Sequence, residues 1–375
     1  QLVYGTANSV KISGFQAVFK GGCALSNTIS SGGSQRVSLG GVAILTTVLK
    51  GGALTVYGNA STAKISGGRA YVTSGASAYN PMVYSGGALI VSNGGTANFA
   101  YASAGGTISA LSGAKITSAD IISGGVLSAG SNTTLNTVTI QSGGIMHVTG
   151  TDVKAANFAI HSAGLLNFNI SSVAESSTAY MLQSTALKTA ASKFRITVKA
   201  QQGIGNYELA SNVTIADNTA FSVYLGNTNL GNALVNSTAL SKNGMQYKVT
   251  ASSGKTLLTT SLVTGAMMKG TAAADTLAGT ANCDIFYGGK GNDVMTAGGG
   301  RDVAVYDTNA WGADTIKATS GTMTILFDGL TASDITSSLS GTTMTITKKA
   351  DSSQKITVQG WNASQHDITY GGTMT

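Results

Sequence analysis

Short apolar strands alternate with glycine turns through the first half of the chain. Gly-Gly pairs recur with a regular step, from 86–87 to 105–106 and then 124–125, and the step from 51–52 to 67–68 is shorter by three. Each period carries a second turn, and short strands such as 88–91 and 144–148 lie between the turns. A strand this short cannot bury its apolar face alone, so it must stack on neighbours about 4.8 Å away. The pattern predicts a β-solenoid of 19-residue coils over 1–170.

A flexible Gly-Ser linker is the alternative interpretation of this composition. A linker, however, does not keep a constant register through half of a chain with its Val, Ile and Leu in phase. The whole chain has 50 glycines, a single proline and 10% charged residues, against about 25% in typical domains. This composition is typical of strands and turns, and we expect an all-β fold.

The repeat reads V-x-S-G-G-x-x-x-V-x-x-G-G, with good copies at 83–95 and 121–130. It resembles the strand-loop-strand repeats of AIDA-type self-associating autotransporter adhesins over about 10–165. The resemblance implies a right-handed parallel β-helix exposed at the cell surface, with adhesive or self-associating behaviour. In some relatives the Ser and Thr residues of the turns are glycosylated. No translocating β-barrel follows, so we do not expect the autotransporter export route.

The regular register stops near position 171. Alternating strands follow, with expected hairpin turns at Gly205-Asn206, Gly226-Asn227 and Asn243-Gly244. The open end of a solenoid exposes strand edges and apolar interior, so we expect an antiparallel β-rich cap or spacer over 171–265. The run 181–199 is the longest stretch of helix formers, and a short helix is expected there.

Four nonapeptides follow one another without a gap from position 270: GTAAADTLA, GTANCDIFY, GGKGNDVMT and AGGGRDVAV. Each has an apolar residue at position eight and an aspartate at position six; these aspartates are Asp275, Asp284, Asp293 and Asp302. A nonapeptide forms a turn and a short strand, and two of them make one coil of a parallel roll. Aspartates that are two nonapeptides apart therefore stack, Asp275 on Asp293 and Asp284 on Asp302.

Facing carboxylates repel one another unless a cation lies between them. Calcium binds about six to eight oxygens, and glycine allows the turn backbone to present its carbonyl oxygens. We expect two calcium sites, formed by the four aspartates and by the glycines of the third and fourth turns: Gly288, Gly289, Gly291, Gly298 and Gly300. An Asp-Gly turn series without metal is the alternative.

The third nonapeptide fits G-G-x-G-x-D-x-U-x at every position, and the series resembles the RTX family of secreted calcium-binding proteins over about 267–318. Units one and two depart from the pattern by lacking glycine at positions two and four, and unit four begins with Ala297. The β-rich tail resembles the segment that follows such rolls. We therefore expect 266–375 to form an RTX-like calcium-binding β-roll, with Trp311 and Trp361 packed over its end.

Right-handed β-helices also host polysaccharide lyases and epimerases, which need clustered acids or bases along one face. The solenoid has two carboxylates, Asp120 and Asp152, and two imidazoles, His147 and His161. Neither pair is separated by a whole number of 19-residue coils, so neither pair stacks. We expect no catalytic residues and no enzyme activity.

The net charge is +7, but no basic stripe interleaves with aromatics, so we expect no nucleic-acid partner. No apolar run is long enough to predict a transmembrane segment. The sequence therefore favours a secreted, extracellular protein of the bacterial cell surface, with calcium, copies of itself, and host or bacterial surface glycans as partners. A calcium-dependent self-assembling subunit of a surface layer or filament is the alternative function.

Overall fold

The computed structural model describes residues 1–174, 179–189, 193–199, 202–213, 215–242, 245–262, 265–318 and 321–371. The chain divides into two compact units. The first consists of Gln1–Ile196, Tyr207–Ala216 and Ala251–Leu257. The second consists of Thr197–Asn206, Asp217–Thr250 and Leu258–Thr375.

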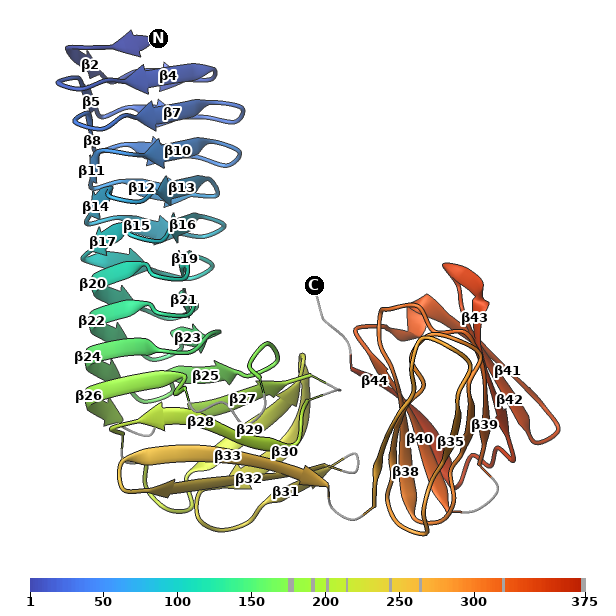
Figure 1. Cartoon of the computed structure of the whole chain (residues 1–375). Helices are drawn as coiled ribbons and strands as arrows, with labels where there is room; N and C mark the ends of the chain where they lie inside the picture. The colour runs from blue at the N-terminus through green and yellow to red at the C-terminus, as the bar shows by residue number, and fades with distance from the viewer. Residues whose placement is uncertain are drawn as a thin grey trace. The chain divides into compact units, whose positions relative to one another are not determined.

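Every element of the described residues is a β-strand except one 3-10 turn, η1 (Ala332–Asp334), and this confirms the predicted all-β fold (Figure 1). The helix expected over 181–199 was a wrong prediction. Two strands, β26 (Leu182–Thr189) and β27 (Lys193–Val198), lie there instead. In β27 buried and outward side chains alternate from Phe194 to Val198, so pairing and burial override helix propensity. Among the residues that the structure describes, no helix is long and apolar enough to cross a membrane.

The first unit is a parallel β-solenoid whose coil passes through one sheet once and through a second sheet twice (Figure 1). The strands of the first sheet in this unit are β1 (Leu2–Val3), β4 (Phe15–Val18), β7 (Ser34–Val37), β10 (Ala53–Val56), β13 (Arg69–Val72), β16 (Ala88–Val91), β19 (Thr107–Ala110), β21 (Val126–Ala129), β23 (Ile145–Val148), β25 (Leu165–Asn169) and β27.

In the second sheet, two short strands of each early coil merge into one longer strand from β20 onward. Its strands in this unit are β2 (Thr6–Asn8), β3 (Lys11–Ile12), β5 (Cys23–Leu25), β6 (Thr28–Ile29), β8 (Val42–Ile44), β9 (Thr47–Val48), β11 (Asn59–Ser61), β12 (Lys64–Ser66), β14 (Ser77–Tyr79), β15 (Met82–Tyr84), β17 (Thr96–Asn98), β18 (Ala100–Ala102), β20 (Lys115–Ile121), β22 (Thr134–Ile140), β24 (Val153–Ile160), β26 and β28 (Gly205–Ser211).

The strand register agrees with the predicted 19-residue period. Ser34 pairs with Ala53, which is one full period further along the chain. Ala53 pairs with Arg69 after a step that is three shorter, which matches the shortened step in the sequence. Parallel pairing continues beyond position 170 with longer coils, since Val153 pairs with Leu182. Most inward side chains of the strands are Val, Ile, Leu and Ala with almost no exposure, so the coils share one continuous core, and the buried Gln16 and Gln35 add a polar pair to its first coils.

The two glycines of each Gly-Gly corner are needed for different reasons. Gly105 has a φ of +74°, which L side chains rarely adopt. Its N–H donates to the carbonyl oxygen of Gly124 in the next coil (2.9 Å). Gly106 has an ordinary φ, but a Cβ there would clash with the carbonyl oxygen of Val83 in the preceding coil. The corner therefore excludes side chains both by conformation and by the closeness of the coils.

The segment between solenoid and nonapeptides contains hairpins. The strands β29 (Ala220–Leu225) and β30 (Thr228–Leu234) pair antiparallel around the predicted turn at Gly226-Asn227. The turn predicted at Gly205-Asn206 is wrong, because both residues lie in β28, and the turn at Asn243-Gly244 lies outside the described residues. The other strands of this segment are β31 (Leu240–Lys242), β32 (Met245–Ser252), which pairs antiparallel with β31, and β33 (Lys255–Leu262).

The nonapeptides and the tail form a β-roll of two sheets in the second unit. One sheet consists of β34 (Met267–Lys269), β36 (Ile285–Tyr287), β38 (Arg301–Tyr306), β40 (Thr322–Asp328) and β44 (His366–Gly371), all parallel. The other consists of β35 (Thr276–Ala278), β37 (Val294–Thr296), β39 (Ala313–Lys317), β43 (Asp351–Gln359), β42 (Thr343–Lys348) and β41 (Ile335–Ser340), the last two antiparallel. Trp311 and Trp361 are buried in the core between the sheets.

The glycine corners predict a matched pair of substitutions. We expect Gly106→Ala to destabilise the solenoid by more than about 1 kcal/mol, because the new methyl group meets a carbonyl oxygen that cannot move without breaking a coil. Gly14→Ala is the control, because nothing lies within 4 Å of its Cβ position and its φ is not positive. We expect that variant to lie within about 1 kcal/mol of the parent or to be more stable. Equal denaturation midpoints for the two variants, measured by circular dichroism, would contradict this account of the corner.

Candidate calcium site

The turns of the nonapeptides stack along the two edges of the roll. Thr276 pairs with Val294, and Ile285 pairs with Val303, so turns that are two nonapeptides apart lie one on the other. The first and third turns therefore share one edge, and the second and fourth share the other edge. The predicted aspartate pairs are brought together by this register.

Within each pair, one aspartate supports the turn that carries the other. The backbone N–H of Asp275 donates to Oδ1 of Asp293 (2.8 Å), and the N–H of Asp284 donates to Oδ1 of Asp302 (2.9 Å). Each link runs from a backbone in one turn to a carboxylate in the turn stacked on it. The aspartates thus act as inter-turn ties as well as charges.

The second carboxylate oxygens of Asp293 and Asp302 have no protein partner. Both residues are 1% exposed, and the Oδ2 atom of each is buried without a hydrogen bond. The first two repeats differ, because Thr271 and Thr280 at position two donate their backbone N–H and hydroxyl groups to Asp275 and Asp284. The third and fourth repeats have glycine at position two and offer no hydroxyl.

The predicted glycines lie where the stacked turns approach most closely. The φ values of Gly289, Gly291, Gly298 and Gly300 are positive, between +82° and +109°. A Cβ at Gly289 or Gly291 would clash with the carbonyl oxygens of Thr271 and Ala273, and a Cβ at Gly288 would come within 2.5 Å of Asp293 Oδ2. Glycine therefore allows backbone oxygens of one turn to face the next turn beside the carboxylates.

Burial makes the charged form of these carboxylates unfavourable. Desolvation raises the pKa of Asp302 to about 7; the N–H of Asp284 opposes this shift, and the charge of Asp284 adds to it. Desolvation likewise raises the pKa of Asp293. A buried carboxylate oxygen without a partner is stabilised by a cation, and an oxygen-only donor set suits calcium. In the described part of the chain no three His, Cys, Asp or Glu side chains cluster, so turn carbonyls would have to complete the ligand set.

One aspartate of this arrangement was missed by sequence reasoning. Asp314 is 1% exposed, accepts the N–H of Asp293 at Oδ1 (2.9 Å), and leaves Oδ2 buried without a hydrogen bond. Burial raises its pKa to about 6. The signal was present, since Gly312, Asp314 and Ile316 have nonapeptide spacing, but the step from Asp302 to Asp314 is three longer than the constant step of the four repeats.

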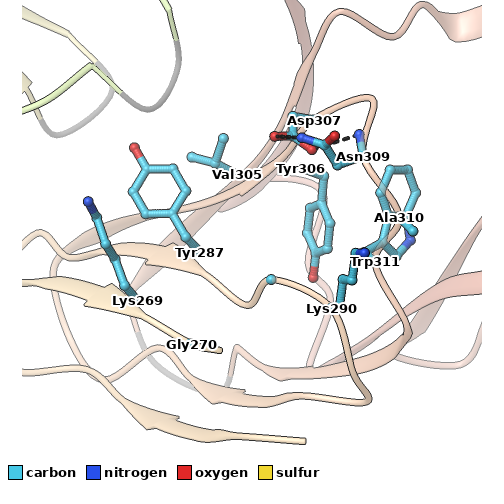
Figure 2. A pocket seen from close by; sticks show the side chains of 11 residues that line it. Lys269, Gly270, Tyr287, Lys290, Val305, Tyr306, Asp307, Asn309, Ala310 and Trp311 are labelled. Atoms are coloured by element: carbon cyan, nitrogen blue, oxygen red, sulfur yellow. Dashed lines mark hydrogen bonds between the residues drawn. The ribbon is translucent and has the colours of Figure 1, made fainter. Parts of the chain in front are cut away.

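A pocket of about 320 Å³ lies beside the turns of the odd-numbered repeats (Figure 2). Figure 2 shows the rings of Tyr287, Tyr306 and Trp311 around it, together with Lys269 and Lys290. The complete lining consists of Lys269, Gly270, Tyr287, Gly289, Lys290, Val305, Tyr306, Asp307, Asn309, Ala310 and Trp311. Sequence reasoning did not find this pocket, because its residues come from separate repeats that only the coil stacking brings together.

Residues 269–304 match the family model of the RTX calcium-binding nonapeptide repeat, in four copies. These residues are therefore calcium-binding repeats, and the match confirms the predicted cofactor. No curated protein matches the chain. Among solved structures, the crystal structure of a TibC-catalysed hyper-glycosylated TibA fragment is 27% identical and covers 55% of this chain and 86% of its own, with a TM-score of 0.34.

The buried carboxylates predict opposite pH responses with and without calcium. With a chelator, the raised pKa of Asp302 means that the folded roll binds more protons than the unfolded chain between about pH 4 and 7. Its stability therefore rises as the pH falls through 7. With calcium, protons compete with the metal, so the stability falls over the same range. Hydrogen exchange resolved by segment measures both trends over 270–318.

The solenoid provides the internal control for this experiment, since its strands contain no nonapeptide. We expect chelation to lower protection in 270–318 and to leave 1–170 unchanged. Identical protection of the roll with calcium and with chelator would contradict the assignment of the metal to these turns.

Proposed function

We propose that the protein is a secreted, non-catalytic cell-surface protein that adheres by self-association of its solenoid, with the calcium-loaded roll as a rigid module. The observation that carries the proposal is a group of three exposed apolar side chains, Leu45, Tyr79 and Phe99, at one corner of the solenoid. The four RTX calcium-binding nonapeptide repeats support a place outside the cell, where calcium is available to fill them.

The corner lies between the two short strands that each early coil contributes to the second sheet. Its residues have left-handed backbone, with φ between +51° and +57°, at Ser9, Ser26, Leu45, Thr62, Asn80 and Phe99. Asparagine, aspartate and histidine are enriched at such positions, but leucine and phenylalanine rarely occupy them. Left-handed backbone costs a residue with a side chain about 1–2 kcal/mol, so Leu45 and Phe99 are not there for stability.

These side chains are also exposed. Leu45 is 46% exposed, Phe99 is 55% exposed, and Tyr79, which is 53% exposed, packs edge-on against Phe99 with ring centroids 5.3 Å apart. We call Leu45, Tyr79 and Phe99 the corner ridge. Backbone hydrogen bonds join successive corners, such as Asn80 N–H to Asn98 O (2.8 Å), so the ridge follows one edge of the coil stack. Tyr79 and Phe99 contact each other, and Leu45 lies two coils before Tyr79 on the same corner. Exposed apolar groups that gather in this way mark contact surfaces.

A second copy of the chain is the partner that fits this ridge best. The ridge lies on one corner of a stack with regular coil spacing, and a second solenoid presents the same spacing, so the ridges of two copies can contact each other. Self-association of copies on neighbouring cells is adhesion. If the copies add without closing, the same contact forms filaments or sheets, and this is the alternative function. Electron microscopy of the purified chain with calcium distinguishes ordered assemblies from discrete rods or pairs.

The strand register supports the non-catalytic part of the proposal. Asp120 pairs with Tyr101 and Thr139 in the neighbouring coils and not with another acid or base. His147 pairs with Asn167, and their side chains hydrogen-bond at 2.8 Å. Burial lowers the pKa of His147, which favours its neutral form. Among the solenoid residues that the structure describes, these groups do not form the stacked acid-base pair that glycan cleavage needs.

The pocket of the roll supports glycans as further partners. Aromatic faces together with a few polar groups in a concave site are typical of small-ligand sites, and two lysines favour an acidic sugar. Both carboxylate oxygens of Asp307 accept hydrogen bonds from Asn309 (2.8 Å each), which orders this part of the rim. We therefore propose an acidic oligosaccharide as the ligand of the pocket.

Neutralising the two lysines tests the pocket. We expect Lys269→Gln with Lys290→Gln to weaken binding of an acidic oligosaccharide about tenfold in calorimetry, because two charge-assisted contacts are lost. The control removes the same charge from exposed positions on β39 and β43, by Lys317→Gln with Lys355→Gln. If both double variants lose the same affinity for the oligosaccharide, the loss reflects net charge alone, and the pocket is not the binding site.

Polar substitution of the corner ridge tests self-association. The variant Leu45→Asn, Tyr79→Ser, Phe99→Asn removes the apolar surface, and asparagine suits the left-handed backbone at positions 45 and 99. We expect a melting temperature equal to or above that of the parent, together with self-association at least about tenfold weaker in sedimentation and bead-clustering assays.

The matched control carries Leu39→Ser, Leu49→Ser and Leu111→Ser, which are exposed leucines of the same solenoid outside the ridge. We expect this variant to associate like the parent. Unchanged association in the ridge variant, or an equal loss in the control, would exclude the ridge as the adhesive surface.

A further inference from the structure

The second unit holds three buried carboxylate oxygens that have no hydrogen-bond partner among the described residues. They are the Oδ2 atoms of Asp293, Asp302 and Asp314. A charged oxygen that is buried and unpartnered is strongly unfavourable, because it has lost its hydration without gaining an opposite charge. Three such atoms in one small roll therefore indicate a missing partner of the same kind at each position.

Each of these oxygens belongs to an aspartate whose other oxygen ties two stacked turns together across a separate gap. A gap is marked by a backbone N–H of one aspartate that donates to Oδ1 of the next. The N–H donors and their acceptors are Asp275 to Asp293 (2.8 Å), Asp284 to Asp302 (2.9 Å) and Asp293 to Asp314 (2.9 Å). The third gap repeats the arrangement of the first two, although the family match ends at position 304.

We infer that 309–317 is a fifth, degenerate nonapeptide repeat and that Asp314, together with Asp293 and facing turn carbonyls, binds a further calcium ion. The inference rests on calcium binding by the four recognised repeats and adds a site to them. Neither the constant aspartate spacing nor the family match includes Asp314.

The fifth repeat has the turn geometry of the others. It reads NAWGADTIK, with glycine at position four, aspartate at position six and a fully buried isoleucine, Ile316, at position eight. Ile316 pairs with Met295, the residue at position eight of the third repeat. A Cβ at Gly312 would clash with the carbonyl oxygen of Gly291, so this turn lies as close to the third turn as the third lies to the first.

A side chain of the third repeat also holds the fifth turn in place. The Asn292 side-chain oxygen accepts the N–H of Ala313 (2.8 Å). The three residues that break the spacing are absorbed before this turn, where β38 extends to Tyr306 and a turn at 307–309 follows. The insertion therefore changes the sequence spacing but not the stacking of the aspartates.

The hydroxyl group of Tyr306 is a further polar group near Asp314. Burial raises the pKa of this hydroxyl well above its ordinary value, and the neighbouring charge of Asp314 adds to the shift, so the hydroxyl is neutral. It has no hydrogen bond in the structure, although it lies close enough to interact with the Asp314 carboxylate. A neutral hydroxyl does not balance a buried negative charge, so Tyr306 does not take the place of a cation.

Counting bound calcium tests this site. The full chain is freed of metal with a chelator, dialysed and titrated with calcium, with the stoichiometry read by calorimetry and native mass spectrometry. We expect three ions for the parent and two for Asp314→Asn. The control Asp367→Asn makes the same chemical change at an exposed position of β44, and we expect it to keep three ions.

Thermal melting separates metal binding from a structural role. The amide of Asp314→Asn keeps an oxygen acceptor for the Asp293 N–H and removes a buried charge. We therefore expect this variant to melt no lower than the parent in chelator, and to gain less from calcium than the parent does.

The inference is overturned if the parent and Asp314→Asn bind the same number of ions. It is also overturned if the melting temperature of the variant lies below that of the parent by the same amount in chelator as in calcium. If the parent and the variant each bind two ions, only the calcium site at Asp314 is refuted. If the parent binds none, calcium binding by the whole roll fails with it.

Discussion

The spacing between parallel coils is the constraint on which the rest of this structure depends. Hydrogen bonds between strands fix this spacing at about 4.8 Å. A residue at a corner must therefore fit between the corner residues of the two neighbouring coils. Gly105 and Gly106 meet this constraint because they have no side chain. Gly105 adopts a positive φ that side chains disfavour, and Gly106 lies against the carbonyl oxygen of Val83. Because each coil contacts only its neighbours, the solenoid gains its stability coil by coil.

The same spacing turns the aspartates of the roll into metal ligands. Two charges about 4 Å apart repel by about 4 kcal/mol at an effective dielectric constant near 20, and burial adds to that penalty. Calcium removes both penalties, so folding of the roll and metal binding are coupled. Thr271 and Thr280 lower the penalty in a second way, because their hydroxyl and backbone N–H groups donate hydrogen bonds to the carboxylates of Asp275 and Asp284. The residue at position two of a repeat thus decides how strongly its aspartate depends on a cation.

Strict periodicity explains what the sequence could predict. The 19-residue coil, its shortened step at Ala53–Arg69 and the stacking of Asp275 on Asp293 all follow from counting residues. The predictions that failed relied on local preference: the helix over 181–199 and the turn at Gly205-Asn206 are both strands, because pairing with adjacent coils outweighs the preference of a short segment. The pocket had no sequence signal, since its residues meet only through stacking.

Asp314 shows most clearly what a count of residue spacing cannot predict. Its turn lies in register with the third turn, although three extra residues separate it from the fourth. The register is held by the strand pairs and by the N–H of Asp293, neither of which requires a constant length of chain between them. An insertion at an exposed turn therefore breaks the motif and leaves the gap between the turns unchanged. In a roll of this kind the stacked turns are linked by hydrogen bonds from the N–H of one aspartate to the carboxylate of the next. This series of aspartates extends one turn beyond the repeats that the sequence spacing predicts.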